Sequence, residues 1–102
     1  MIALLNQNLP ALEHLCRQHH VERLEVFGSA TTATFDLEKS DLDFLVRFQQ
    51  PASMNLSDQY FGLAEGLEAL FGRKVDLVMK GALKNPYFTQ SVNETRELLY
   101  AA

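Results

Sequence analysis

Two aspartates stand at the start of an apolar run, and this arrangement constrains the chain more than any other stretch. Asp41 and Asp43 flank Leu42 and lead directly into the apolar residues 44–46. Residues two apart on a β-strand point to the same face, so the two carboxylates would lie roughly 6–7 Å apart along the backbone. Like charges at that separation repel each other unless a cation neutralises them. The pattern therefore indicates either a divalent-metal site or a polar strand entrance with two solvated aspartates.

A second motif lies upstream of the aspartates and favours the metal site. Gly28 and Ser29 follow residues 22–27, in which polar and apolar residues alternate as they do along a half-buried strand. A junction of strand, glycine and helix presents backbone N–H groups to an anion, and a serine hydroxyl adds a further contact. Gly-Ser alone is a common turn. Together with a pair of carboxylates, it predicts a phosphate-binding turn beside a divalent cation.

A third carboxylate stands inside another apolar stretch. Asp76 interrupts the segment 74–79, which we predict to be a strand. A charge on such a strand needs a partner, because an unpaired charge is costly to bury. An arginine is one candidate partner. A metal ion already bound by Asp41 and Asp43 is the other, and it fits better if the two strands are neighbours.

The remaining segments predict helices that pack on a small sheet. Apolar residues recur at helical spacing, and we expect helices at 9–19, 58–71 and about 91–100. Cys16 lies on the apolar stripe of the first of these and is expected in the core. The predicted fold class is α/β (α+β), a small mixed β-sheet with packed helices. Since the chain has 102 residues and no internal repeat, we expect one domain, residues 1–102.

Composition narrows the classes of function. The net charge of −4 disfavours a general nucleic-acid binder, which usually presents a basic face, but it is compatible with a nucleotide whose charge a metal neutralises. A single cysteine excludes an internal disulfide and a cysteine-based zinc cluster. No apolar run is long enough to span a membrane, and the N-terminus lacks the pattern of a secretory signal. We therefore expect a cytoplasmic protein.

These motifs together resemble those of a known family. The Gly28-Ser29 turn, the Asp41-x-Asp43 pair and the later Asp76 are similar to the signature of the DNA polymerase β-type nucleotidyltransferases. Within that superfamily, the chain resembles the minimal nucleotidyltransferase (MNT) group over nearly its whole length. That likeness rests on five segments, 27–30, 35–36, 40–46, 74–78 and 83–88.

The resemblance implies a polymerase β-type fold, a site and a reaction. In the superfamily, the aspartates hold two divalent ions and the Gly-Ser turn holds the nucleotide phosphates. Carried over, Asp41, Asp43 and Asp76 would bind Mg²⁺ as the catalytic residues, and Gly28 and Ser29 would bind the nucleotide, ATP. Two ions about 3.5–4 Å apart stabilise the attacking oxygen and the leaving pyrophosphate. Asp76 is the natural candidate to help deprotonate an attacking hydroxyl.

The resemblance also implies a partner. MNT proteins usually pair with a small helical HEPN protein, a ribonuclease-type toxin. This chain would then be the antitoxin, which transfers AMP from ATP to a tyrosine of its HEPN partner within a hetero-oligomer.

Two alternatives stay open. One is an antitoxin that blocks its HEPN partner by binding alone, because the chain reads Thr31-Thr32-Ala33 where members often carry Ala-Arg-Gly. Loss of a cation and a glycine at these positions would weaken phosphate binding or change how the turn approaches the ligand. The other is transfer of a nucleotide to a small molecule or a nucleic acid.

Overall fold

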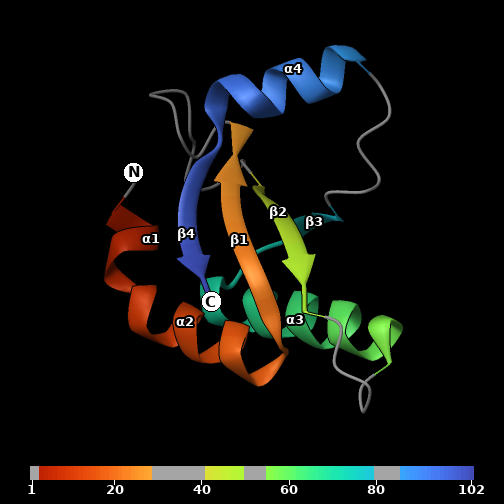
Figure 1. The fold of residues 1–102 in the computed structure, drawn as a ribbon. Coiled ribbons are helices and arrows are strands. Elements are labelled where there is room, and N and C mark those ends of the chain that lie inside the picture. Colours follow the sequence, from red (N-terminus) through yellow and green to blue (C-terminus); the bar gives the residue numbers. More distant parts are fainter. Residues whose placement is uncertain (1–2, 29–40, 50–54, 80–85) are drawn as a thin grey trace.

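The computed structural model describes residues 3–28, 41–49, 55–79 and 86–102 (Figure 1). These ranges contain both helices and strands. Their order is α1 (Ala3–Gln7), α2 (Leu9–Gln18), β1 (Val21–Phe27), β2 (Leu42–Phe48), α3 (Leu56–Phe71), β3 (Val75–Met79), α4 (Pro86–Thr95) and β4 (Glu97–Ala101). The architecture is mixed α and β, which confirms the predicted fold class.

Within the described ranges, four strands form one sheet in the order β3-β2-β1-β4. β1 pairs antiparallel with β2 and with β4, whereas β2 and β3 run parallel. Parallel strands require a crossover connection, and α3 lies between β2 and β3 in the chain. The sheet is therefore mixed, as expected. It also places β3 directly beside β2, which is the condition for a carboxylate site shared between these strands.

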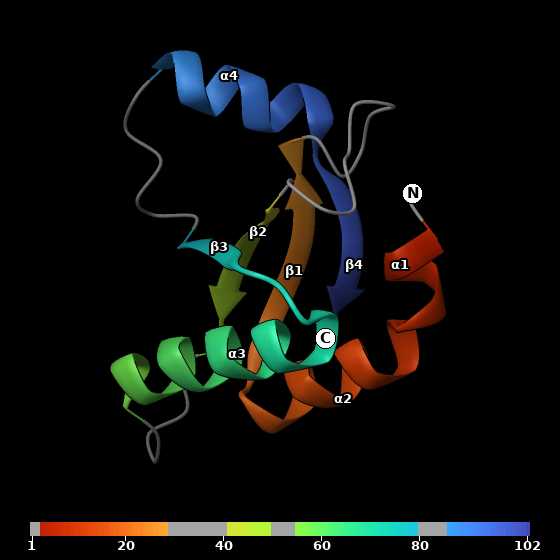
Figure 2. The same ribbon diagram turned by 180° about the vertical axis from the view of Figure 1, so that it is seen from behind.

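The larger apolar cluster lies between the sheet and the helices α2 and α3, which pack side by side in both views (Figure 1, Figure 2). Leu12 and Cys16 of α2 and Leu63 of α3 meet Leu24 of β1 and Phe44 of β2 there, and none of the five is exposed. Burial also raises the pKa of the Cys16 thiol to about 12. The expected core position of this cysteine is confirmed.

A smaller cluster lies on the opposite face of the sheet, where α4 crosses the end of β1 (Figure 1). It consists of Phe27, Leu45 and Val92, with Val78 packed against it. Leu45 alternates along β2 with the residues of the larger cluster, as the two-residue period of a strand requires. Both faces of β2 are therefore covered near the point where Asp43 lies.

Residues next to α3 in the sequence determine where this helix begins and ends. Asn55 precedes the helix in an extended conformation, and its side-chain oxygen accepts a hydrogen bond from the Ser57 amide at 2.8 Å. The helix ends at Gly72, which adopts the left-handed conformation with φ of 64°. α3 is the longest helix of the described chain, and no helix in that part has the length and apolar character to cross a membrane.

The C-terminal region corrects the sequence expectation. The helix expected at about 91–100 ends at Thr95, and residues 97–101 form β4. From Leu24 to Phe27, β1 is buried on both faces, so the backbone groups of its second edge need hydrogen-bond partners, and β4 supplies them in a register that pairs Leu24 with Tyr100. Leu99, which fits an apolar helix face equally well, enters the core from this strand. The long-range pairing, rather than the local pattern, decides the conformation.

Candidate functional site

The parallel pairing of β2 and β3 brings two of the predicted site residues together. Asp43 and Asp76 are direct partners in the register of the two strands. A side-chain hydrogen bond with Asp76 is among the causes that raise the pKa of Asp43, so the two carboxyl groups lie within hydrogen-bond reach, with protonated Asp43 as the donor and Asp76 as the acceptor. Asp43 is half-buried and Asp76 is exposed at the edge strand. Two carboxyl groups at such a distance share either a proton or a cation.

The surroundings of Asp43 favour its neutral form. Its pKa rises from the ordinary value of 3.8 to about 6, and burial is the largest cause. The negative charge of Asp76, the hydrogen bond between the two groups and the charge of Asp41 follow in that order. A bound cation would offset the two electrostatic causes. The site is therefore arranged so that positive charge stabilises it.

Gly28 lies directly after β1 and borders the site next to Asp43. It follows Phe27, the register partner of Asp43, and its φ is +75°, a conformation that glycine adopts readily. A β-carbon at this position would lie 2.7 Å from Oδ2 of Asp43. Gly28 is thus needed for its backbone conformation and for the space that the carboxylate occupies.

A pocket of about 310 Å³ lies beside the two aspartates. It is lined by Phe27, Asp43, Tyr60, Val75, Asp76, Leu77 and Val78. The hydroxyl of Tyr60 donates a hydrogen bond of 2.6 Å to the Leu77 carbonyl, which fixes this ring against β3. A concave site with apolar walls and a few convergent polar groups is typical of a small-molecule site.

The sequence model of the nucleotidyltransferase domain family matches residues 11–99. The chain belongs to this family. It is 40% identical over 86 residues to a Methanocaldococcus jannaschii protein with the provisional name protein adenylyltransferase MJ0128, a match that covers 84% of this chain and 82% of the relative. It is 37% identical over 84 residues to protein adenylyltransferase MntA of Thermococcus cleftensis, covering 76% of this chain and 82% of the relative.

Solved structures share the fold of this nucleotidyltransferase. One, described provisionally as a minimal nucleotidyltransferase, has a TM-score of 0.70 and 32% identity, and the match covers 91% of this chain and 90% of that chain. Another is a complex of a tri-AMPylated Shewanella oneidensis HEPN toxin with an MNT antitoxin, with a TM-score of 0.64, 20% identity and coverage of 96% and 73%. The latter likeness concerns the fold alone. The family predicted from the motifs is confirmed.

The carboxylates of this nucleotidyltransferase fit Mg²⁺ as a pair. In the described ranges, no group of three or more His, Cys, Asp or Glu side chains is arranged to hold a metal ion. Mg²⁺ usually binds to one or two carboxylates and completes its shell with water and substrate phosphates. Asp43 and Asp76 provide that pair, and Asp41 lies near enough for its charge to raise the pKa of Asp43.

The amide of Gly28 has a partner that the sequence did not indicate. Its N–H donates a hydrogen bond of 2.9 Å to Oγ1 of Thr95, 67 residues away at the end of α4. The pairing of β4 with β1 and the packing of α4 against Phe27 bring these residues together. Recognition of residues 97–101 as a strand is the signal that would have pointed to Thr95.

Part of the predicted nucleotide site lies outside the described residues. Ser29 and the segment Thr31-Thr32-Ala33 fall in the range 29–40, which the structure does not describe. The phosphate contacts of Ser29 therefore stay a prediction, and so does the effect of the unusual segment. Gly28 and the three aspartates are the predicted site residues that the structure places.

Proposed function

We propose that this nucleotidyltransferase is an antitoxin that transfers AMP from ATP to a tyrosine of a HEPN-type toxin. The carboxyl pair of Asp43 and Asp76 beside a pocket of about 310 Å³ is the observation that carries the proposal. The names of relatives support the transfer of AMP to a protein. The fold shared with an MNT antitoxin in complex with an AMPylated HEPN toxin supports the partner. The proposal places the reaction in the cytoplasm, with residues 1–102 as one catalytic domain.

Each site residue has a part in the proposed reaction. Asp43 and Asp76, with Asp41 close enough to add its negative charge, would hold Mg²⁺, which when bound neutralises the triphosphate and the leaving pyrophosphate. The Gly28-Ser29 turn binds the phosphates. The tyrosine oxygen forms a bond to the α-phosphorus while the bond from that phosphorus to the pyrophosphate oxygen breaks. Asp76, exposed at the edge strand, accepts the proton of the hydroxyl.

Intact-mass spectrometry of the HEPN protein tests this proposal. The protein encoded beside this chain is co-purified with it and incubated with ATP and Mg²⁺, and we expect mass increments equal to AMP. Asp43→Ala should lower the rate at least about a thousandfold, because loss of a cation ligand removes several kcal/mol of transition-state stabilisation. Glu65→Ala, which removes an exposed carboxylate from α3, is the control and should transfer AMP at the wild-type rate.

A binding-only antitoxin is the competing function, and the Thr31-Thr32-Ala33 segment is the observation that favours it. The same purified proteins separate the two. Toxin activity that is suppressed without ATP, and suppressed equally by Asp43→Ala, would establish inhibition by binding. Suppression that requires ATP and leaves an AMP increment on the toxin would exclude it.

A further inference from the structure

We propose that Thr95 is a positioning residue of the nucleotide site, which holds Gly28 and thereby the start of the phosphate-binding turn. The proposal rests on the function proposed above and adds a residue to it. The contact that carries it is the hydrogen bond of 2.9 Å from the Gly28 amide to Oγ1 of Thr95. It joins two segments that lie 67 residues apart, directly beside the Asp43 carboxylate.

Thr95 is itself held in place by the packing of α4. One turn before it, Val92 is fully buried against Phe27 and Leu45. Helical hydrogen bonding continues past Thr95, because the Arg96 amide donates to the Val92 carbonyl at 2.8 Å. The hydroxyl of Thr95 is therefore presented by a helix end whose apolar side is anchored in the smaller cluster.

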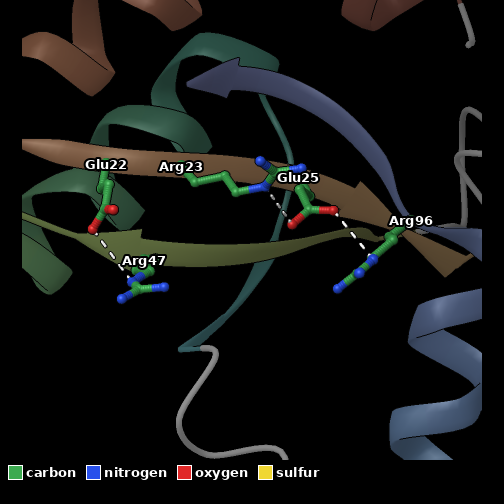
Figure 3. Close-up of polar contacts among 5 residues, drawn as sticks. All are labelled: Glu22, Arg23, Glu25, Arg47 and Arg96. Carbon is green, nitrogen blue, oxygen red and sulfur yellow. Dashed lines mark hydrogen bonds and ion pairs between the residues drawn. The ribbon is translucent and has the colours of Figure 1, made fainter. Parts of the chain in front are cut away.

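A second contact holds the neighbouring residue to the same strand. Nε of Arg96 lies 3.4 Å from Oε2 of Glu25, and Nε of Arg23 lies 3.0 Å from Oε1 of the same carboxylate (Figure 3). The Glu25 side chain is only 5% exposed, so its charge depends on these two guanidinium groups. Two successive residues, Thr95 and Arg96, thus bind two points of the β1 region. Displacement of the helix end along β1 would break both contacts.

A small displacement of the Gly28 amide would change the position of the backbone that binds the nucleotide. Its N–H belongs to the planar peptide group between Phe27 and Gly28, so the bond to Thr95 sets the orientation of that plane. That orientation sets the direction of the backbone at Gly28, where the Gly28-Ser29 turn predicted from the sequence begins. It also sets the approach of Gly28 to Asp43, where a β-carbon would come within 2.7 Å of Oδ2. Thr95 therefore acts on the nucleotide through the backbone of Gly28.

Removal of the hydroxyl at constant shape tests the proposal. For Thr95→Val we expect KM for ATP, and the Kd of ATP measured by calorimetry with Mg²⁺, to rise about three- to tenfold, the value of one hydrogen bond. Thr95→Ser keeps the hydroxyl, so both constants should stay within about twofold of their wild-type values. Thr89→Val, in the same helix, is the control and should leave both unchanged.

The outcomes separate this inference from the proposed function. Absence of AMP transfer by the wild type would end the proposed function, yet the Kd series would still decide the role of Thr95. Wild-type Kd and KM for Thr95→Val would overturn the inference, as would an equal loss in Thr95→Ser. If Thr95→Val does not fold, Thr95→Ala is measured in its place against the same expected values, with thermal unfolding of each variant recorded alongside.

Discussion

The two faces of the sheet differ in what their side chains contribute. The face under α2 and α3 is apolar throughout its centre, and Leu42, Phe44 and Val46 of β2 point into it. The opposite face places Asp43 and Leu45 of the same strand beside Asp76 and the buried carboxylate of Glu25. Successive residues of one strand therefore supply either core packing or the candidate site.

The difference shows that the two faces are subject to different physical requirements. The apolar face gains stability from burial and depends on the size and shape of its side chains. The other face carries a carboxyl whose pKa is raised by burial and by neighbouring negative charge, which means that its ionised form opposes folding. We infer that the site is kept at a cost in stability that the apolar face offsets.

The largest expected effect is on the apolar face. Phe44→Ala should lower the free energy of unfolding by about 3–5 kcal/mol, because it leaves a cavity where the ring is fully buried and stacks on Phe71 at 6.1 Å. Phe61→Ala is the matched control, since that ring is 61% exposed, and should change stability by no more than about 0.5 kcal/mol. Chemical denaturation measures both. Equal losses for the two variants would contradict the conclusion that the apolar face gains its stability from the burial of Phe44.

An intermediate effect is expected for the buried carboxylate of the second face. Glu25→Gln should cost about 1–2 kcal/mol, because it leaves Arg23 and Arg96 without their negative partner while both remain partly exposed to water. Glu22→Gln removes the partner of Arg47 in a half-exposed pair and should cost less than about 1 kcal/mol (Figure 3). Urea denaturation of the pair of variants checks the order, and the reverse order would contradict it.

The smallest effect has the opposite sign and concerns Asp43. In the folded chain its pKa is about 6, whereas in the unfolded chain it is close to the ordinary value of 3.8. The native state therefore binds the extra proton between these values, and stability falls as the pH rises from about 4 through about 6. Asp43→Asn has no carboxyl at this position, so its stability does not fall in this way over the same pH range. With metal removed by a chelator, it should be more stable than wild type by about 1 kcal/mol at pH 8, with solvent screening of the half-buried group taken into account.

Thermal unfolding at pH 4 and pH 8 measures this difference. The advantage of Asp43→Asn should disappear at pH 4, where the wild-type carboxyl is protonated in the native state. Glu65→Gln, which removes an exposed carboxylate of α3, is the control for the loss of one negative charge. A variant that is less stable than wild type at pH 8 would show that Asp43 stabilises the fold instead of opposing it.

Sequence patterns of short range indicated much of the fold and of the site. The two-residue period of a strand, which places Asp41 and Asp43 on one face, also leaves Leu42 and Phe44 to point to the core, and Gly28 marked the end of β1. The helical stripe correctly placed Cys16 in the core. These features repeat with the period of a helix or a strand, so they are visible in the sequence. The carboxylates stood out because they lie beside apolar strand residues, although Asp76 is exposed at the edge strand β3 and bears no burial cost there.

The tertiary structure decided those features that depend on contacts between residues far apart in the sequence. Residues 97–101 have an apolar pattern that suits a helix or a strand, and the open edge of β1 selects the strand. The same pairing brings Thr95 to Gly28 and Arg96 to Glu25. The sequence by itself thus determined the carboxylates and the glycine of the site. The contacts that hold them were decided by strand pairing across more than half of the chain, which no local period encodes.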